Sequence, residues 1–422
     1  MSDDPRRLVR RTFWAEGISR VGDAVSVVAL PLTAVLVVGA SPGELALIGA
    51  AQALPIVFFS LPVGGWVDRR AGRWPILLAG DIVRAALLVA VPVAAFGGVL
   101  SVPLLAAVAF LISVAGTFFD LAFAGWLPRL LRGDDLHRVN ARIELARSTA
   151  VVVGPAMGGA LVSAFSAPVA LVADAVSFAA SAVLIGSVRR SEAFLAQPAD
   201  GGTALSRSGL AAGFGFVLAS PYLRAVLATA GTNNLARSIA MGVAVLYLVD
   251  VAGLTAAEVG VAFALGNLGF VAGALVARRV TARFGMGIAM QLAVALFGPG
   301  MLVFALAPTQ LAGAAFATML FSNGLGISIH NVNQVTVRQV LIPDALRGRA
   351  AAVFRLVIFG AVPVGTVVGG IVGEWLGLRA ALLVSGIGLL AGSAPYLLVR
   401  ITRLRSMSEL VDANRRVAVL TP

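Results

Sequence analysis

Apolar stretches, each about as long as a lipid bilayer is thick, recur along the whole chain with short polar connections between them. A helix that crosses a bilayer needs roughly 20 mostly apolar residues. Helices also satisfy their own backbone hydrogen bonds, which lipid cannot do. The pattern therefore predicts an all-α polytopic membrane protein with twelve spanning helices, at 12–37, 43–65, 75–97, 103–126, 146–165, 168–188, 223–249, 256–277, 286–306, 311–337, 349–372 and 379–399.

The connections alternate in charge. Most of the 32 basic residues, all of them arginine, lie in every second connection and in both terminal segments, whereas the opposite connections contain only Arg379. Because cytoplasmic loops are enriched in basic residues, both termini are predicted to be cytoplasmic. The lack of lysine and the richness in Ala, Gly and Val are typical of a high-GC bacterial genome, so we expect a multi-pass protein of the bacterial cytoplasmic membrane.

Two loop sequences recur about half a chain apart. The segment 127–133 (LPRLLRG) is echoed by 342–348 (IPDALRG), and 64–70 is echoed by 273–279. With six helices in each repeat, both halves keep the same orientation, which predicts a parallel repeat with a site between the halves at the membrane midplane. The predicted parts are a six-helix bundle at 1–188, a cytoplasmic linker with a possible surface helix at 189–222, a second bundle at 223–399 and a cytoplasmic tail at 400–422.

Composition removes several kinds of chemistry. Only 12% of the residues are charged, against about 25% in soluble domains. The chain has no Cys and only two His, so we expect no metal site, no cofactor and no enzymatic activity. The net charge of +12 is explained by the basic connections, and nucleic acid is not an expected partner.

Two short motifs carry a family resemblance. The loop after the second predicted helix reads Gly-x-x-x-Asp-Arg-x-x-x-Arg, and the fifth helix contains Gly-Pro-x-x-Gly-Gly. With Ser19-x-x-Gly22-Asp23 and the segment 340–349, they resemble the major facilitator superfamily over essentially the whole chain. The similarity is to its drug:proton antiporter-like branch, with the macrolide efflux pumps and the enterobactin exporter. The residues concerned are Gly64, Gly65, Asp68, Arg69, Gly72, Arg73 and Asp81 as a gating set, and Gly154, Pro155, Gly158 and Gly159 in helix five.

The resemblance implies a secondary active transporter. Its branch implies a proton-coupled exporter of a small amphiphilic molecule, such as a drug, antibiotic or siderophore, by alternating access. The alternatives are an importer of a nutrient or siderophore, or a membrane sensor that no longer transports. The expected partners are the small-molecule substrate, protons and the lipid bilayer, and we expect a monomer. In the second copy of the loop motif Ala277 stands at the Asp position, so a full charge relay is not expected there.

Charged residues inside the spans are the candidates for this chemistry, because each costs roughly 2.5–3.5 kcal/mol at the bilayer centre. Asp23 lies about 16 Å along helix one, near the midplane, and is the first candidate for proton exchange or for contact with a cationic substrate. Its alternative is a structural ion pair. Glu16 is spaced to pair with Arg20, and Asp81 with Arg84. Asp120 is expected to pair with Arg73 or Arg84 as a gate or a static contact, and Asp174 is a weaker candidate.

The second half offers mainly amide side chains. Helix ten contains Asn323, His330, Asn331 and Gln334, which suggests a helix that faces water; His330 is interpreted either as a proton relay or as a packed, hydrogen-bonded residue. Helix seven contains Asn233, Asn234 and Arg237, as a cavity face or as interhelical hydrogen-bonding groups. We therefore expect the N-terminal half to carry the proton chemistry and the C-terminal half to complete the substrate cavity.

Overall fold

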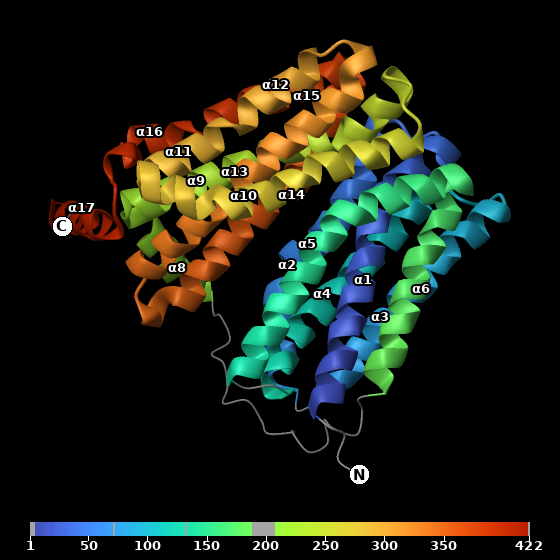
Figure 1. Cartoon of the computed structure of the whole chain (residues 1–422), viewed down its shortest axis with the longest axis horizontal. Coiled ribbons are helices and arrows are strands. Elements are labelled where there is room, and N and C mark those ends of the chain that lie inside the picture. The colour runs from blue at the N-terminus through green and yellow to red at the C-terminus, as the bar shows by residue number, and fades with distance from the viewer. Residues whose placement is uncertain (1–4, 71, 131–132, 188–206, 421–422) are drawn as a thin grey trace. The chain divides into compact units, whose positions relative to one another are not determined.

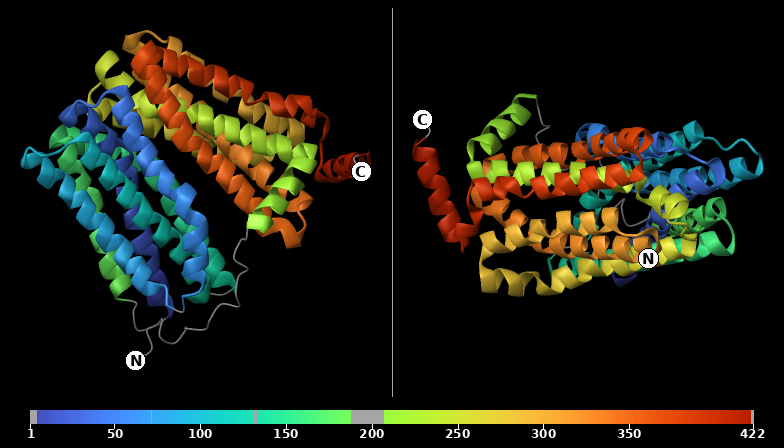
Figure 2. Two further views of the ribbon diagram at one scale, coloured as in Figure 1. Left: turned by 180° about the vertical axis from the view of Figure 1, so that it is seen from behind. Right: turned by 90° about the horizontal axis from the view of Figure 1, so that it is seen from above.

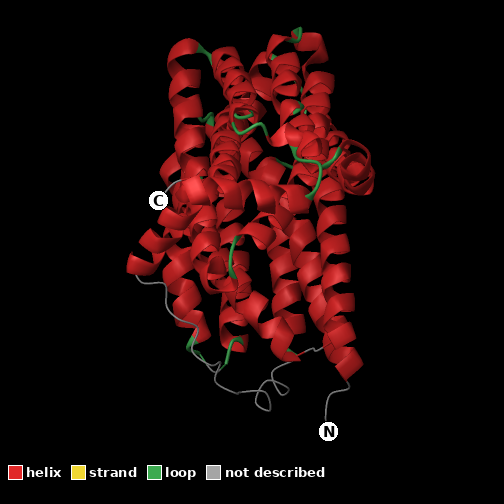
Figure 3. Ribbon diagram, turned by 90° about the vertical axis from the view of Figure 1, so that its left-hand side faces the viewer, coloured by secondary structure: helices red, strands yellow, loops and turns green. Residues whose placement is uncertain are grey.

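Helices make up the structure of this chain, which is a computed structural model describing residues 5–70, 72–130, 133–187 and 207–420. No strand occurs in these four ranges (Figure 3). Twelve helical segments within them are long and apolar enough to cross a membrane. The predicted all-α polytopic fold with twelve spans is therefore confirmed.

The chain divides into two compact units. Unit 1 comprises 1–204 and 254–264, and unit 2 comprises 205–253 and 265–422. The helices of unit 1 run side by side (Figures 1 and 2), with bounds α1 Pro5–Thr33, α2 Pro42–Asp68, α3 Trp74–Phe96, α4 Val102–Leu130, α5 Gly133–Ala164 and α6 Ala167–Gly186. An aromatic-rich cluster around Phe119 and Trp126 joins α2, α3 and α4 in its core.

Unit 2 holds the remaining helices except for the first turns of α10. Residues 256–264 of that helix belong to unit 1, and the rest of it belongs to unit 2. The bounds are α8 Arg207–Ala219, α9 Pro221–Leu246, α10 Ala256–Phe284, α11 Met286–Ala295, α12 Phe297–Leu306, α13 Ala312–Leu341, α14 Arg347–Leu376, α15 Leu378–Ala391, α16 Ala394–Leu398 and α17 Met407–Leu420. Helix α8 occupies the segment where a surface helix was predicted. Its position on a membrane surface stays a prediction.

Two predicted helices are each divided in the structure. The ninth span is split into α11 and α12, and the twelfth into α15 and α16. A proline explains each break, because its ring clashes with the carbonyl four residues earlier. Pro299 acts in this way on Ala295, the last residue of α11, and Pro395 acts on Ala391, the last residue of α15.

The fifth predicted helix was placed too late in the sequence. Helix α5 begins at Gly133, thirteen residues before the predicted start at 146. The residues in between are helical but highly charged, so a prediction based on apolar length starts the helix only after them. Helix α17 in the C-terminal tail was not predicted either, because it is amphipathic and too short to be recognised by apolar length.

The internal repeat also appears in the backbone. A turn of π-helix at Ala34–Val38 precedes Gly39, and a second at Tyr247–Val251 precedes Gly253. Both glycines have φ of 69°, which a residue with a Cβ rarely adopts. After each glycine a capping box begins the next helix, between Ser41 and Glu44 in one half and between Thr255 and Glu258 in the other. The two halves therefore share this backbone signature at the same place in each repeat.

Candidate functional site

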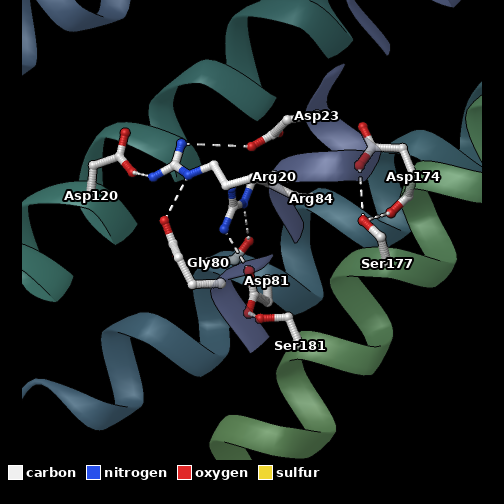
Figure 4. Close-up of polar contacts among 10 residues, drawn as sticks. Arg20, Asp23, Gly80, Asp81, Arg84, Asp120, Asp174, Ser177 and Ser181 are labelled. Carbon is white, nitrogen blue, oxygen red and sulfur yellow. Dashed lines mark hydrogen bonds and ion pairs between the residues drawn. The ribbon is translucent and has the colours of Figure 1, made fainter. Parts of the chain in front are cut away.

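Arg20 on α1 is the centre of a charged cluster in unit 1 (Figure 4). Its guanidinium lies 2.6 Å from Glu16 Oε1, 2.9 Å from Asp120 Oδ1 and 3.8 Å from Asp23 Oδ2. The predicted pair of Glu16 with Arg20 is present. Glu16 is buried, whereas the side chains of Asp23 and Asp120 are 38% and 55% exposed. One cation therefore serves three carboxylates, and Asp23 is held at the longest distance.

A second arginine is enclosed within the bundle. Arg84 Nη2 lies 2.5 Å from Asp81 Oδ1, and its Nε donates to the carbonyl of Gly80 at 3.3 Å. Its guanidinium also lies over the rings of Phe119 and Phe178, at 4.5 and 4.0 Å from their centroids. The predicted Asp81–Arg84 pair is thus present, and both side chains are almost fully buried. A cation flanked by two aromatic rings is held by cation–π attraction as well as by its ion pair.

Hydroxyl groups of α6 and α1 complete the set of polar contacts. Ser181 Oγ donates to Asp81 Oδ2 at 2.7 Å. Asp174 accepts from Ser26 on α1 and from Ser177 on its own helix, the latter at 3.1 Å. A Cβ at Gly22 would overlap Ser177 and Asp174, so glycine is required for α1 to approach α6 at this level.

Asp174 takes a larger part in the polar contacts of unit 1 than the sequence suggested. It is 2% exposed and lies at a helix–helix contact, although it was treated as a weak candidate. Ser26, Ser177 and Ser181 were not singled out at all. The two serines of α6 could have been found from their spacing, since Asp174, Ser177 and Ser181 lie three and four residues apart and share one face of a helix.

The partner expected for Asp120 was wrong. Asp120 pairs with Arg20, neither with Arg73 nor with Arg84. Arg73 is buried and its guanidinium lies against Gly125 of α4, where any Cβ would overlap it. Five residues separate Asp120 from Gly125, which places them about 140° apart around the helix axis. Arg73 and Asp120 therefore lie on different faces of α4.

The segment for which a gating role was predicted is described in part. Gly64 and Gly65 lie near the end of α2, Arg69 and Gly72 are exposed, and Arg73 is buried. The side chain of Asp68 lies outside the described part of the chain, so its expected charge relay stays a prediction. Arg69 Nη1 is 3.8 Å from the position that a Cβ at Gly65 would take.

The glycines of the helix-five motif are sites of close backbone approach. A Cβ at Gly154 would overlap Ala24 of α1, and one at Gly158 would lie 2.8 Å from the carbonyl oxygen of Val25. On another side of α5, a Cβ at Gly159 would lie 2.9 Å from the Cα of Gly260 in the first turns of α10, which belong to the same unit. Pro155 lies inside the helix between these contacts. These small residues therefore allow α5 to lie against two backbones.

Most of the polar residues of helix ten, which is α13, do not face water as expected. Asn323, His330 and Gln334 are 3%, 7% and 7% exposed, whereas Asn331 is exposed. Spacings of seven and eleven residues bring the first three onto one face of an α-helix, and that face is inside unit 2. His330 Nε2 is 2.7 Å from the hydroxyl of Tyr396, a partner on α16 that sequence reasoning missed.

The cluster predicted in helix seven, which is α9, is divided between two faces. Asn233 is buried against Gly392, where a Cβ would overlap its Oδ1. Asn234 donates to the carbonyl of Ala230 at 2.9 Å and accepts from Arg237 at 3.3 Å. Four buried amide oxygens of unit 2 have no hydrogen-bond partner among the described residues, namely Asn233 Oδ1, Gln291 Oε1, Asn323 Oδ1 and Gln334 Oε1.

The two units therefore differ in charge. The cluster in unit 1 contains five carboxylates and two guanidinium groups, which would give a net charge of −3 if all were ionised. Among the described residues of unit 2, the buried polar side chains are amides, hydroxyls and His330, and none of them is a carboxylate. An excess of negative charge inside a membrane span needs a proton or a cationic ligand to offset it.

Known proteins resemble this chain along its length. Residues 5–418 match the family described as transmembrane secretion effector. The multidrug efflux pump Tap of Mycobacterium tuberculosis is 29% identical over 182 residues, which span 42% of this chain and 43% of that protein. The protein of the same name in Mycolicibacterium fortuitum is 28% identical over 425 residues, covering 96% of this chain and 98% of its own length.

Solved structures share the fold at low sequence identity. A bacterial homologue of the iron transporter ferroportin, in an inward-facing state, superposes with a TM-score of 0.75 at 15% identity over 95% of this chain and all of that one. A mutant form of the nucleoside transporter NupG gives 0.74 at 13% identity over 93% and 99%. Twelve spans, the helix-five motif and a family match over nearly the whole chain together lead to one conclusion: this chain is a membrane transporter of the major facilitator superfamily and belongs to its transmembrane secretion effector family.

Proposed function

We propose that this transporter is a proton-coupled exporter of small amphiphilic molecules, with a preference for cations. The observation that carries the proposal is the excess of carboxylates over guanidinium groups in unit 1. Each unpaired charge in a span is costly. A proton or a cationic substrate relieves the same excess, so the two compete for one site. The efflux function in the names of the Mycobacterium and Mycolicibacterium relatives supports export.

Asp23 is the proposed site of this competition. Its carboxylate is the most distant of the three around Arg20, at 3.8 Å against 2.6 and 2.9 Å, and it remains accessible at 38% exposure. Loss of its charge leaves Arg20 paired with Glu16 and Asp120. Protonation of Asp23 therefore leaves the rest of the cluster in place and removes the attraction for a bound cation.

The transport cycle follows from this competition. With Asp23 ionised, a cationic substrate binds from the cytoplasm, and the halves 1–188 and 223–399 rock around it as the two moving parts of alternating access. A proton entering from the outer side displaces the substrate, and the protonated form returns and releases this proton to the cytoplasm before the next substrate binds.

Everted membrane vesicles test the proposal, with ethidium as a fluorescent amphiphilic cation. An imposed gradient, acidic inside, drives ethidium accumulation by the wild type, and collapsing the gradient abolishes it. Asp23→Asn loses gradient-driven accumulation. Asp344→Asn, which changes a carboxylate of 84% side-chain exposure in the connection before α14, leaves it intact as the matched control. Accumulation that ignores the gradient contradicts proton coupling, and net movement in the opposite direction supports the importer instead.

A further inference from the structure

A groove lies on one side of unit 1, where α5 and α6 both pack against α1 but leave space between each other. Its volume is about 580 Å³. In Figure 1, α1 is visible between α5 and α6 along this side. The groove is almost entirely apolar, and among the described residues that line it none is acidic. It is separate from the charged cluster around Arg20.

Small residues create the groove. Gly17 and Gly22 of α1 line it, and so do Ala146 of α5 and Ala180 of α6. A Cβ at Gly17 would touch only Ala146, at 3.7 Å, so the space above it is open. Large side chains stand along its edges, among them Trp14, Leu145 and Val176, which are 53%, 68% and 61% exposed. The result is a narrow groove with small residues at its base and large apolar side chains along its sides.

The groove has the length of one membrane leaflet. Its lining on α1 extends from Phe13 to Val25, which are twelve positions or about 18 Å of helix apart. Half of a hydrocarbon core about 30 Å thick is about 15 Å. The Phe13 end is the one that the charge pattern predicts to be cytoplasmic. The groove therefore matches an acyl chain of the cytoplasmic leaflet in length and polarity.

Two arginines mark the cytoplasmic end. Contacts of Gly17 with Ala146 and of Gly154 with Ala24 fix the parallel register of α1 and α5, and this register brings Arg142 level with Phe13. Arg142 lines the groove directly. Arg11 precedes Trp14 by three residues on the same stripe of α1, and its Nη1 donates to the carbonyl of Ser187 after α6 at 3.2 Å. Basic groups at the cytoplasmic ends of membrane helices attract anionic lipid headgroups.

We propose that this groove binds one anionic phospholipid of the cytoplasmic leaflet. An acyl chain lies along α1 between α5 and α6, and the phosphate meets the guanidinium of Arg142, with Arg11 at the same end. The positive charge of this end selects an anionic headgroup over a zwitterionic one. The inner end of the groove reaches Gly22 and Ser177, which hold α1 against α6 beside Asp174. A bound chain therefore supports the contact between α1 and α6 on which the site in unit 1 is built.

Native mass spectrometry of the purified full chain tests the proposal, with equal amounts of dioleoylphosphatidylglycerol and dioleoylphosphatidylcholine added in detergent. The wild type retains one phosphatidylglycerol in preference to phosphatidylcholine. Arg142→Gln weakens that binding about fivefold, as expected for one basic group near a charged headgroup. Arg147→Gln, an exposed arginine of α5 outside the groove, leaves the binding unchanged.

A second pair of variants tests the position of the acyl chain. Ala180→Phe fills the groove from α6 and reduces retained phosphatidylglycerol, whereas Ala179→Phe places the same side chain on an exposed neighbouring position outside it and does not. Equal retention of both lipids, or equal losses in each matched pair, would overturn the proposal. Stronger ethidium binding in Arg142→Gln, lost again on adding Ala180→Phe, would assign the groove to an amphiphilic cation and overturn the lipid.

Discussion

Arg20 of α1 and Asp120 of α4 form an ion pair of 2.9 Å between residues a hundred positions apart in the sequence. The same guanidinium contacts Glu16 at 2.6 Å. Arg20 therefore neutralises a buried carboxylate of its own helix and an exposed one of another helix. The ion pairs of Glu16, Asp23 and Asp120 all depend on Arg20, and we expect the three carboxylates to contribute unequally to stability.

Asp120→Asn is expected to lower the free energy of unfolding by about 1 kcal/mol or less, because an exposed ion pair contributes little. Arg20→Gln is expected to lower it by considerably more, since it leaves the buried Glu16 without its cation. Thermal unfolding of the detergent-solubilised protein measures both. Equal losses in the two variants would show that the cluster is not centred on Arg20.

Asp81→Asn is expected to destabilise the protein by roughly 3–5 kcal/mol, because it leaves the guanidinium of Arg84 buried without its ion pair. Ser181→Ala removes one hydrogen bond to the same carboxylate and costs about 1 kcal/mol. Midpoints of thermal unfolding rank the two variants. If removing the hydroxyl costs as much as removing the charge, the cation–π contacts with Phe119 and Phe178 hold Arg84 without Asp81.

Gly154→Ala is expected to destabilise unit 1 and to impair transport, because the new Cβ overlaps Ala24 of α1. Gly116→Ala is the matched control, since it lies within a spanning helix and has no atom within 4 Å of its added Cβ. That change is expected to be neutral or to stabilise by about 0.5–1 kcal/mol, because alanine is the better helix former. Identical behaviour of the two variants in unfolding and transport assays would refute the close-approach interpretation of the helix-five motif.

Tyr396→Phe is expected to cost about 1 kcal/mol of stability and to leave proton coupling unchanged. The hydroxyl of Tyr396 satisfies His330 Nε2 at 2.7 Å inside unit 2, which favours the packing interpretation of this histidine. His330→Gln is expected to behave in the same way. Ethidium transport at several imposed gradients is the measurement, and loss of gradient dependence in His330→Gln would transfer the proton chemistry to the second half.

Much of the fold could be predicted from the sequence because lipid imposes a simple rule on spanning helices. Apolar length located the twelve spans, and the repeated loops indicated the repeat. The same rule misplaced the start of α5, because residues 133–145 are charged and still helical. It also overlooked the breaks near Pro299 and Pro395, since each broken span keeps its apolar composition.

The candidate site was less predictable. Pairs within one helix, such as Glu16 with Arg20 and Asp81 with Arg84, follow from spacing alone. Contacts between helices depend on rotation about each axis, which a single sequence does not specify. Asp120 was therefore assigned the wrong arginine, and the bond from Ser26 to Asp174 was missed. His330 was recognised, but its partner Tyr396 is 66 residues away on another helix.

Proton release on substrate binding is the most direct test of the central claim that a proton and a cationic substrate compete for Asp23. The purified protein is placed in weakly buffered detergent solution with a pH-indicator dye, and ethidium is added while its binding is followed by fluorescence. At starting pH values acidic enough for Asp23 to be protonated before binding, the wild type is predicted to release protons as ethidium binds, and Asp23→Asn to release none. No release from the wild type on binding, or undiminished release from Asp23→Asn, would contradict the account.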